Sequence, residues 1–298
     1  MMVTNKMEYD LFLGCVIPAR LPFLEASSRL IFEKMGIKLK DIEGFSCCPD
    51  PTGIEQIDHD TWMTLGARNL SLSNNGNGGI ISFCSGCVET LKGVNYSFNK
   101  EKKLQTKING YLKKVGKNYD GSTNVKHFGE VLYENLDLVK ENIVNPLNGF
   151  KVAVHYGCHY LRPSEIINWD DPFEPTTIDT IVHTLGAETI DYDLKLECCG
   201  NPVEKSDKDL SLLMIENKLN SIIDSGANCV ALVCPACYQQ FDFNQHELNK
   251  RNEREYSISI FYLSELIGLA FGISPKEMGL KYHRVKPDNL FQTIKFEN

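Results

Sequence analysis

The chain has 298 residues and a formal net charge of −8, with 42% hydrophobic and 23% charged residues. These proportions are typical of a soluble globular protein with room for two domains of ordinary size. Because no broad Lys/Arg face accompanies the acidic balance, nucleic acid is excluded as the main partner.

The N-terminal sequence and the apolar runs predict the location of the chain. Residues 1–14 lack the basic head, long apolar stretch and small-residue cleavage site of a signal peptide, and they form a polar lead-in to a strand. The longest apolar runs fall well short of the roughly eighteen residues that a membrane-spanning helix needs. We therefore expect a cytoplasmic protein with no membrane span.

The first half of the chain is predicted to alternate strands and helices. A strand over residues 9–14 precedes a helix over residues 24–35, whose apolar positions follow a helical period and which Gly36 ends as a C-cap. A further strand over residues 78–83 runs into a C-x-x-C and a helix. Residues 95–148 are predicted to form a helical, polar connection to the second half.

The second half repeats this order. A strand over residues 152–157 precedes a helix over residues 178–185, which Gly186 ends in the same relative place. A strand over residues 229–233 runs into the second C-x-x-C. The tail is predicted to add an apolar helix over residues 262–271 and a less regular end.

Cysteine gives the strongest signal. The chain has eleven cysteines, a high number for an intracellular protein, in which disulfides are rarely stable. Ten of them form two copies of one pattern: a single cysteine, an adjacent pair and a C-x-x-C. The first copy comprises Cys15, Cys47, Cys48, Cys84 and Cys87, and the second comprises Cys158, Cys198, Cys199, Cys234 and Cys237.

This repeat and the alternation of elements predict the fold class. We expect an α/β fold of two tandem, pseudo-symmetric domains, residues 1–148 and 149–298, each with a small, mostly parallel sheet and flanking helices. Ligands of such sheets bind beyond the carboxyl ends of the strands. Each set of five thiols is therefore expected to converge there.

Iron–sulfur ligation explains five thiols better than the alternatives do. Structural zinc uses four ligands, typically from two C-x-x-C knuckles, and a thioredoxin-like site needs no further cysteines. Clusters are held by cysteine thiolates. Because adjacent side chains diverge, Cys47 and Cys48 either serve different irons or include one thiolate that bridges two irons. Five thiolates also exceed the four of a cubane, so we expect a cluster that is not a simple cubane.

Segments around the cysteines carry a family resemblance. They are FLGCVIPARLPFLEASSRL, DTWMTLGARNL, FCSGCVETL, VHYGCHYLRP, ECCGNP, CPACYQQFD and LSELIGLAFGISPKEMGL. In this order they resemble the family of heterodisulfide reductase B subunits, whose chains carry a pair of cysteine-rich CCG domains. The resemblance covers nearly the whole chain, with one departure: the first adjacent pair continues as CCP instead of CCG.

The resemblance implies the cofactors, the substrate and the partners. The cofactors would be two non-cubane [4Fe-4S] clusters, one per CCG domain, bound by all ten motif cysteines. The substrate would be the mixed disulfide of coenzyme M and coenzyme B, which is cleaved reductively between the clusters to two thiols in methanogenesis. Electrons would arrive from the ferredoxin-like C subunit, which the flavoprotein A subunit supplies, with a hydrogenase or formate dehydrogenase module in the larger complex.

The chain itself shows no nucleotide-binding or flavin-binding motif. The glycine-rich residues 76–79 precede a predicted strand instead of opening a helix, so they fit neither a Rossmann motif nor a P-loop. A partner must therefore bring the electrons.

Three further residues are candidates for substrate chemistry. His159 is the predicted catalytic proton donor, and its alternative role is a hydrogen bond to a cluster sulfur or the backbone. Arg20 and Arg162 follow the first cysteine of each copy at similar offsets and are predicted to bind the anionic groups of the substrate, or else to form surface salt bridges. His155 and Cys229 lie within strands and are predicted to be core residues, with the histidine hydrogen-bonded.

Two other functions stay open. A CCG-domain subunit of a flavin-dependent lactate, glycolate or glycerol-phosphate oxidoreductase would relay electrons. Such subunits often carry extra ferredoxin motifs or have lost one site, whereas both motifs of this chain are complete. A non-enzymatic electron-transfer protein or a zinc-stabilised scaffold is the third possibility. Metal content and disulfide reductase activity distinguish the three.

Overall fold

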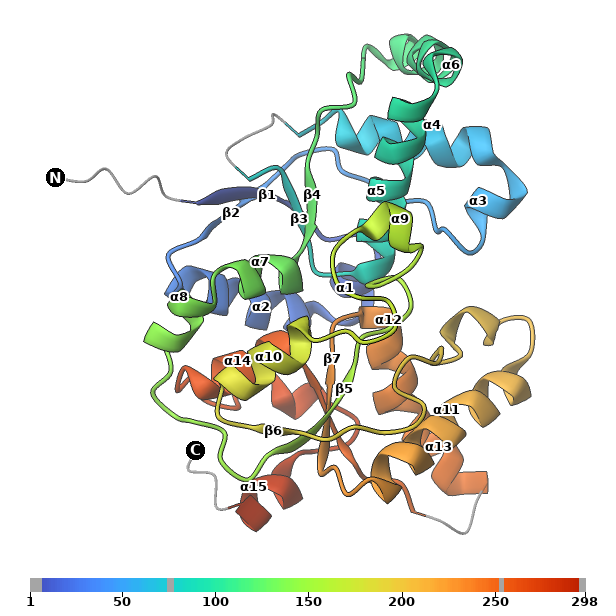
Figure 1. Ribbon diagram of the computed structural model, residues 1–298. Coiled ribbons are helices and arrows are strands. Elements are labelled where there is room, and N and C mark those ends of the chain that lie inside the picture. The colour runs from blue at the N-terminus through green and yellow to red at the C-terminus, as the bar shows by residue number, and fades with distance from the viewer. Residues whose placement is uncertain (1–6, 74–77, 252–254, 295–298) are drawn as a thin grey trace, which may run out of the picture.

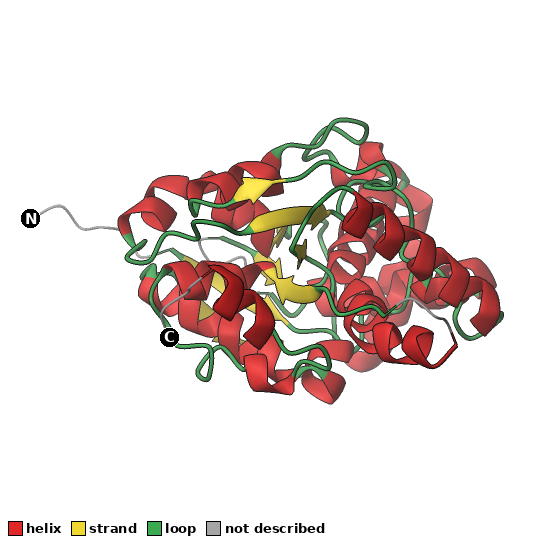
Figure 2. Cartoon of the chain, turned by 90° about the horizontal axis from the view of Figure 1, so that it is seen from below, coloured by secondary structure: helices red, strands yellow, loops and turns green. Residues whose placement is uncertain are grey.

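The computed structural model describes residues 7–73, 78–251 and 255–294, and two four-stranded sheets form the centre of this part of the chain (Figures 1 and 2). Their strand orders are β2–β1–β3–β4 and β6–β5–β7–β8, and every pairing is parallel. Helices surround both sheets. The predicted α/β fold with two similar parallel sheets is confirmed.

Each half contributes one sheet and the helices between its strands. The first half comprises β1 (Glu8–Phe12), α1 (Val16–Arg20), α2 (Pro22–Lys34), β2 (Lys38–Asp41), α3 (Ile54–Ile57), α4 (His59–Leu70), β3 (Ile80–Ser82), α5 (Ser85–Lys100), α6 (Lys102–Leu112), η1 (Lys113–Val115), β4 (Val125–His127), α7 (Phe128–Glu134) and α8 (Leu136–Glu141). The second half comprises β5 (Lys151–His155), α9 (Ser164–Ile167), α10 (Thr177–Thr184), β6 (Glu188–Thr189), η2 (Asn201–Val203), α11 (Lys208–Asp224), β7 (Cys229–Leu232), α12 (Pro235–Tyr238), η3 (Gln239–Phe243), α13 (Asn244–Arg251), β8 (Ser259–Tyr262), α14 (Leu263–Ala270), η4 (Leu280–Tyr282) and α15 (Asp288–Ile294).

The four predicted strands are confirmed as the central strands β1, β3, β5 and β7. Because helices cover both faces of a parallel sheet, central strands are apolar without alternation, and every residue of β7 is buried. The predicted helices coincide with α2 and α10. Gly36 (φ 71°) and Gly186 (φ 86°) follow these helices in the left-handed conformation that a C-cap glycine adopts.

The sequence-based description of the edge strands was wrong in two places. Residues 95–148 are not only a helical connection, because they include β4, which pairs with β3. Residues 262–271 are not all helical either, because Tyr262 ends β8 and the helix α14 begins one residue later. β4 and β8 are as short as the predicted strands β3 and β7, but β4 (VKH) has a polar residue at its centre and β8 (SIFY) continues directly into the apolar helix α14, so neither strand is set apart in the sequence. Residues 76 and 77 of the glycine-rich stretch lie outside the described residues.

The two halves pack through reciprocal helix contacts that follow the repeat. The helix after the fourth strand of each half lies on the second helix after the first strand of the other half, so that α14 packs on α2 and α7 packs on α10 (Figure 1). Ser27 and Ser28 of α2 each lie 3.0 Å from the hydroxyl of Ser264 on α14. One continuous apolar core therefore includes residues of both halves.

Candidate metal centre

Glycine residues let the first cysteine of each copy approach its C-x-x-C. Cys15 follows β1 and Gly14 (φ 69°), where a Cβ atom would lie 2.6 Å from the sulfur of Cys87. Gly157 (φ 74°) holds the same place in the second half, with the sulfur of Cys237 at 3.5 Å from its Cβ position. A glycine at the end of the first strand thus gives both the turn and the room for a thiol.

Each C-x-x-C begins a helix directly after a central strand. Cys84 is the N-cap of α5 and Cys234 is the N-cap of α12. The residues before them are Phe83 and Val233, and the hydroxyl of Tyr262 donates to both of their carbonyl groups. One buried hydroxyl at the end of β8 therefore fixes the start of both C-x-x-C segments.

His127 ends β4 and holds the place in the first half that Tyr262 holds in the second. Burial lowers the pKa of His127 to about 3, so the ring is neutral. Nδ1 accepts a hydrogen bond from the backbone of Gly129, which leaves the proton on Nε2. Nε2 lies 3.0 Å from the carbonyl oxygen of Val233 and 3.2 Å from the hydroxyl of Ser85. The second C-x-x-C is thus held by side chains of both halves.

The two adjacent pairs are held by different contacts. The amide of Asn69 on α4 donates to the carbonyl of Cys47 at 3.1 Å. After the second pair comes Gly200 (φ 87°), whose carbonyl accepts a hydrogen bond from Ser211 at 2.9 Å. A Cβ atom at Gly200 would lie 2.9 Å from the carbonyl oxygen of Ser211, which explains the glycine of the second motif. Pro49 stands at this place in the first half.

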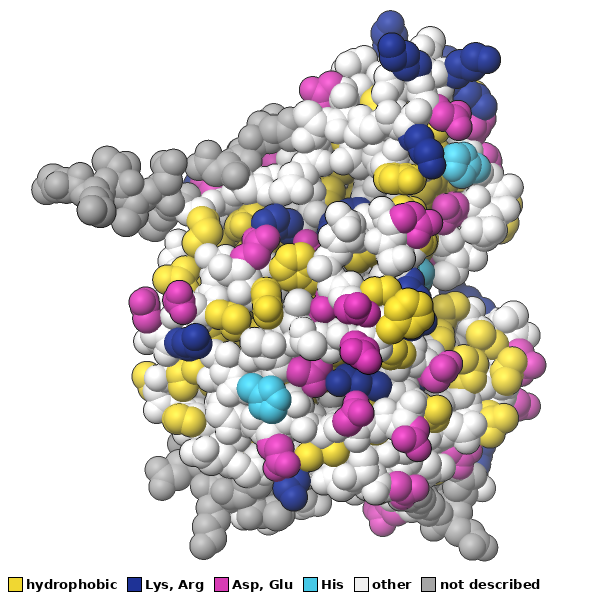
Figure 3. Space-filling view, viewed as in Figure 1, with side chains coloured by type: hydrophobic (Ala, Val, Ile, Leu, Met, Phe, Trp, Pro, Cys, Tyr) yellow, Lys and Arg dark blue, Asp and Glu magenta, His cyan; other side chains and the backbone are white. Residues whose placement is uncertain are grey.

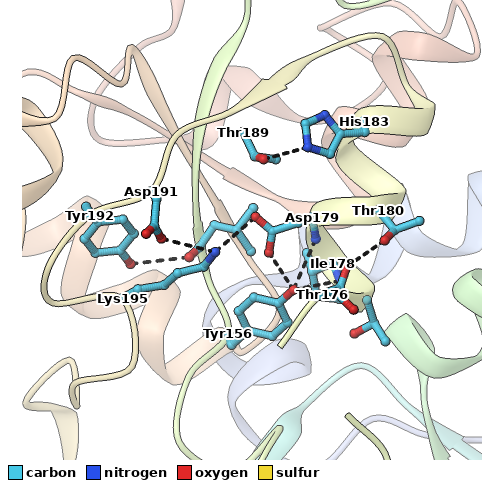
Figure 4. Close-up of polar contacts among 12 residues, drawn as sticks. Tyr156, Thr176, Ile178, Asp179, Thr180, His183, Thr189, Asp191, Tyr192 and Lys195 are labelled. Atoms are coloured by element: carbon cyan, nitrogen blue, oxygen red, sulfur yellow. Dashed lines mark hydrogen bonds and ion pairs between the residues drawn. The ribbon is translucent and has the colours of Figure 1, made fainter. Parts of the chain in front are cut away.

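A polar network holds the segment that leads to the second pair (Figure 4). The hydroxyl of Tyr156 donates to Asp179 on α10 at 2.6 Å, and Lys195 lies 3.1 Å from the other oxygen of this carboxylate. Lys195 also lies 3.6 Å from Asp191, and the hydroxyl of Tyr192 donates to the backbone of β5 at 3.4 Å. Helix α10 therefore ties together the two chain segments that carry the second cysteine set.

The ten motif thiols form one continuous row, in which each thiol shifts the pKa of the next through hydrogen bonding. The order is Cys15, Cys47, Cys48, Cys87, Cys84, Cys234, Cys237, Cys199, Cys198 and Cys158. This thiol row is palindromic: the second copy follows the first in reverse, and the two meet where Cys84 lies beside Cys234. Hydrogen bonds from neighbouring thiols lower the pKa of Cys48, Cys198 and Cys234, whereas hydrogen bonding and burial raise the pKa of the other seven motif cysteines. The ten thiols therefore lie within hydrogen-bonding reach of one another along the row.

One cleft of about 540 Å³ opens onto the thiol row from both halves. All of the ten cysteines except Cys198 line it. His159 and Arg20 line it as well, whereas Arg162 is absent from its described lining. The guanidinium group of Arg162 is exposed and points toward the carbonyl of Pro172, at 3.4 Å. The structure thus brings two of the three predicted substrate residues to the thiols.

Glu89 is a site residue that the sequence analysis missed. It lies on α5, two residues after the C-x-x-C, and is 4% exposed. Burial raises the pKa of Glu89 to about 8, and the nearby carboxylates of Glu55 and Asp50 add to this effect. Its Oε2 has no hydrogen-bond partner and lies 3.8 Å from Nδ1 of His159. The signal in the sequence was the polar residue at this offset in both copies, because Gln239 occupies it in the second.

Three more residues complete the surroundings of the thiols. Lys205 lines the cleft from the loop after η2 and was not predicted. Cys229 is fully buried, which confirms its predicted core position. His155 is buried as predicted, but the expectation that it is hydrogen-bonded was wrong, because neither ring nitrogen has a partner of normal geometry. It ends β5 and faces the thiols of Cys199 and Cys237 instead of a polar group of the core, within 4.8 Å.

The donor set fits iron–sulfur ligation. Each half presents five thiols, one more than a tetrahedral zinc site uses, and only one C-x-x-C. The orphaned imidazole beside the second set also suits a group with sulfur acceptors, since a buried polar group without a partner is costly. The residues present are therefore compatible with an iron–sulfur cofactor in each half.

A duplicated α/β fold with two cysteine sets on one cleft defines a class of paired cysteine-rich proteins, and comparison with known proteins agrees. Residues 9–92 and 152–242 match the cysteine-rich domain, CCG. The chain is 36% identical to the B subunit of the ferredoxin:CoB-CoM heterodisulfide reductase of Methanosarcina mazei, over 95% of this chain and 94% of that protein. The chain belongs to the CCG domain family, in its group of heterodisulfide reductase B subunits.

Other relatives show the range of this family. The chain is 33% identical to a protein of Archaeoglobus profundus that is named as similar to the heterodisulfide reductase B subunit, over 91% of this chain and 93% of that protein. It is 32% identical to the 8-methylmenaquinol:fumarate reductase membrane anchor subunit of Wolinella succinogenes, over 96% and 99%. Among the described residues, no helix combines the length and apolar character that crossing a membrane requires.

A solved structure shares the fold. A hypothetical protein from Helicobacter pylori superposes with a TM-score of 0.79 at 18% identity, over 95% of this chain and 52% of that chain. At this identity the likeness concerns the fold alone.

Proposed function

We propose that this chain is the catalytic subunit of a heterodisulfide reductase, which reduces the mixed disulfide of coenzyme M and coenzyme B to two thiols. One observation carries the proposal: the palindromic thiol row brings two equal donor sets to a single cleft. A substrate with two reacting sulfurs suits such a site. The relatives named as heterodisulfide reductase B subunits, at 36% identity over nearly the whole chain, support this choice.

The ten cysteines would hold the cofactors. In each of the two proposed domains, residues 1–148 and 149–298, the five motif cysteines would bind one non-cubane [4Fe-4S] cluster. When bound, the clusters would supply the two electrons that the disulfide takes up. The electrons themselves would come from a ferredoxin-like C subunit, which a flavoprotein A subunit supplies, in a complex with a hydrogenase or formate dehydrogenase module.

The side chains of the cleft would bind the substrate and deliver protons. Cleavage of the S–S bond takes up two electrons and two protons and releases two thiols. His159 would donate one proton, and the protonated Glu89 at 3.8 Å would orient its ring. Arg20 and Lys205 would bind anionic groups of the substrate in the cleft. Arg162 would have to turn away from the carbonyl of Pro172 to reach the substrate.

The cysteines fit a reducing compartment. All eleven lie in the described residues, and no disulfide joins any two of them. Because disulfides persist in oxidising compartments, we infer that the chain works in the cytoplasm.

The competing function is an electron relay. The relative from Wolinella succinogenes is named as a subunit of a fumarate reductase, so subunits of this family also serve other substrates. A relay would need the clusters but would not need a proton donor and anion-binding side chains in the cleft. Those side chains favour the disulfide reductase.

The decisive experiment combines metal analysis with an activity assay. We expect the anaerobically purified protein to contain about eight irons and about eight sulfides, and to reduce the mixed disulfide with a dye as electron donor. Zinc in place of iron would sink the cluster assignment. Iron without any disulfide reduction would leave the chain as a relay.

A further inference from the structure

A second groove, of about 740 Å³, opens beside the cleft. It lies between the start of α2, Phe243 of η3 and the segment 276–284 near the C-terminus. Arg20 lines both the groove and the cleft of the thiol row, so the two spaces adjoin at this side chain. We call it the basic groove, because four of its lining residues are Arg20, Lys276, Lys281 and Arg284.

Two of the four cations of the basic groove lie over aromatic rings. The guanidinium carbon of Arg284 lies 5.3 Å from the centre of the Phe243 ring, and the ammonium group of Lys281 lies 4.9 Å from the Tyr282 ring. Phe23 stacks on Tyr282, with the ring centres 5.8 Å apart. Among the described residues, no carboxylate lies within ion-pair distance of the four cations of the groove. Their charge is therefore available to a ligand.

The basic groove stands out by its lining and not because positive charge is rare elsewhere. The chain carries a net charge of −8, and on the face shown in Figure 3 the basic side chains gather at the upper end, over α6, and stand among acidic ones below it. In the basic groove the described lining contains one carboxylate, that of Glu277, against four cations. Guanidinium and ammonium groups beside aromatic faces suit phosphate and carboxylate oxygens.

We propose that the basic groove binds the phosphate- or carboxylate-bearing end of the substrate whose reacting bond lies in the cleft. This inference rests on the proposed function and adds the position of the anionic end. Arg20 would contact the part of the substrate that passes from the cleft into the groove.

Charge reversal in the groove tests the proposal. The variant would carry Lys276→Glu, Lys281→Glu and Arg284→Glu, and the control Lys114→Glu removes an exposed lysine that also lies over a tyrosine ring, at 5.6 Å. In the assembled complex, we expect the triple variant to raise KM for the mixed disulfide at least tenfold with kcat within about twofold, and the control to change neither.

Each other outcome has a defined meaning. An unchanged KM in an active triple variant overturns the groove as a substrate site. A fall in kcat at unchanged KM also overturns it and points to docking of an acidic electron donor. If the wild-type complex has no reductase activity, the proposed function fails, and calorimetric binding of the mixed disulfide then decides about the groove: equal affinity of wild type and triple variant overturns it.

A second, independent observation concerns the last residue of the first strand in each half. Phe12 ends β1 and pairs in register with Ser82, and His155 ends β5 and pairs in register with Leu232. Each stands three residues before the first cysteine of its copy. The two sites thus differ at one equivalent position, a phenyl ring in the first half and an imidazole in the second.

The imidazole is placed to interact with the second cysteine set. His155 is 1% exposed, neither ring nitrogen has a hydrogen-bond partner of normal geometry, and a ring nitrogen lies within 4.8 Å of the sulfurs of Cys199 and Cys237. An imidazole carries at least one N–H donor whether it is neutral or protonated. The buried ammonium group of Lys218 acts on the same two cysteines. Both residues also lie beside a phenyl ring, since the ring centre of Phe12 is 5.0 Å from that of Phe45 and the ring centre of His155 is 4.9 Å from that of Phe241.

We infer that His155 donates a hydrogen bond to a sulfur of the group held by the second cysteine set, and that this group has a higher reduction potential than its counterpart in the first half. Hydrogen bonds to sulfur and nearby positive charge stabilise the reduced, more negative state of a cluster. A donor role fits better than a ligand role, because the first half offers its five cysteines with no nitrogen at this position. The inference rests on the proposed cofactors.

Redox titration of the loaded protein, followed by electron paramagnetic resonance, tests this inference. We expect two distinct potentials in the wild type. His155→Phe should lower one of them toward the other at unchanged iron content. His183→Phe is the matched control, because His183 of the same half is exposed and has its hydrogen bond, 2.8 Å to Thr189 (Figure 4).

Two equal reduction potentials in the wild type would overturn the inference. So would two reduction potentials in His155→Phe that are the same as those of the wild type. Both outcomes would leave the proposed clusters in place. If His155→Phe loses iron, the reciprocal change Phe12→His decides. A rise of the lower potential supports the inference, and no rise contradicts it. Protein without iron in the wild type refutes the proposed cofactors and the inference with them.

Discussion

The two cysteine sites have the same set of thiols, but the residues around those thiols differ. In the first half, Cys48 and Cys87 belong to an apolar cluster that includes Phe12 and Trp62. In the second half, the equivalent thiols face the unpaired imidazole of His155 and the buried ammonium group of Lys218. The polar segment 190–196 with its network on α10 also belongs to the second half alone (Figure 4).

This comparison shows how the two copies of a duplicated site can come to differ while the elements that build them stay the same. The strands, the glycine turns and the thiol row are repeated, so both halves can hold the same group. The residues that touch the thiols from outside have changed, and they decide charge, polarity and proton supply. Substitutions at the shared residues and at the residues that differ separate these two contributions.

Loss of one C-x-x-C thiol in either half should have the largest effect. Cys87→Ala and Cys237→Ala each remove one member of the thiol row, and each should remove about half of the iron and nearly all disulfide reduction, because both sites face one cleft. Iron analysis and the reductase assay check this. Cys229→Ala, which removes a buried thiol outside the row, should keep its iron. Full iron content in both row variants would contradict the assignment.

Proton delivery should be one-sided. His159 lines the cleft beside the first cysteine of the second copy, whereas Val16 holds the equivalent place in the first. His159→Asn should lower kcat about 10²-fold with little change in KM, because a general acid acts in the transition state. Val16→Asn should leave kcat within about twofold. Equal losses in both variants would show a structural effect and not proton donation.

Removal of the hydroxyl at the end of β8 should weaken the joint between the halves. Tyr262→Phe leaves the buried carbonyl of Phe83 without its donor, whereas Val233 keeps the contact with His127. We expect a loss of about 1–3 kcal/mol in stability, which lowers the thermal midpoint of the loaded protein by several degrees. Tyr111→Phe, at an exposed ring, is the control and should change little. An unchanged thermal midpoint in Tyr262→Phe would show that this hydroxyl does not stabilise the contact between the halves.

The smallest effect concerns pH. The glutamates at the third position of α7 and α14 cap these helices, but Glu130 pairs with Lys92 at 2.8 Å and Glu265 pairs with His283 at 2.8 Å. Burial alone would lower the pKa of His283, but the carboxylate of Glu265, with a weaker contribution from Asp242 and against a small opposing one from Lys286, raises it.

Protonated His283 therefore stabilises the fold at pH values below its ordinary pKa, near 6.5, and this contribution is lost as pH rises through the raised value. We expect the stability difference between wild type and His283→Gln to be largest at low pH and to narrow above it. Thermal unfolding from pH 5 to pH 9 measures this difference. Burial raises the pKa of Glu130, so its ion pair with Lys92 weakens toward the acid end of the range, and the stability difference of Lys92→Gln should narrow as pH falls, opposite to that of His283→Gln.

The sequence predicted the repeated frame well for a physical reason. Buried central strands and glycine turns are local signals, and the spacing of Cys84 from Cys87 or of Cys47 from Cys48 is read directly from the chain. The edge strands β4 and β8 were not predicted, although they are no shorter than β3 and β7, because β4 is partly polar and β8 runs directly into an apolar helix. The central strands, the glycine turns and the cysteines are therefore predictable from local sequence, whereas the edge strands are not.

The residues that surround the thiols could not be predicted in the same way. Glu89 and His159 lie in different halves, and only the packing of the halves brings them within 3.8 Å. His155 follows a strand pattern that predicts a core residue, and its unpaired nitrogens become visible only when the thiols are in place. The basic groove joins Arg20 to residues 276–284, which have no counterpart in the first half. Contacts between distant segments are what a single sequence hides.

The reciprocal helix contacts between the halves have a consequence for the origin of the molecule. Two identical copies of one half, paired about a two-fold axis, would make the same reciprocal contacts as α2 with α14 and α7 with α10, and their thiols would meet in the same palindromic order. Such a homodimer would already have had a cleft with two equal sites. Joining the copies in one chain let each half mutate alone, which a symmetric dimer does not allow, and the pair Phe12 and His155 records that freedom.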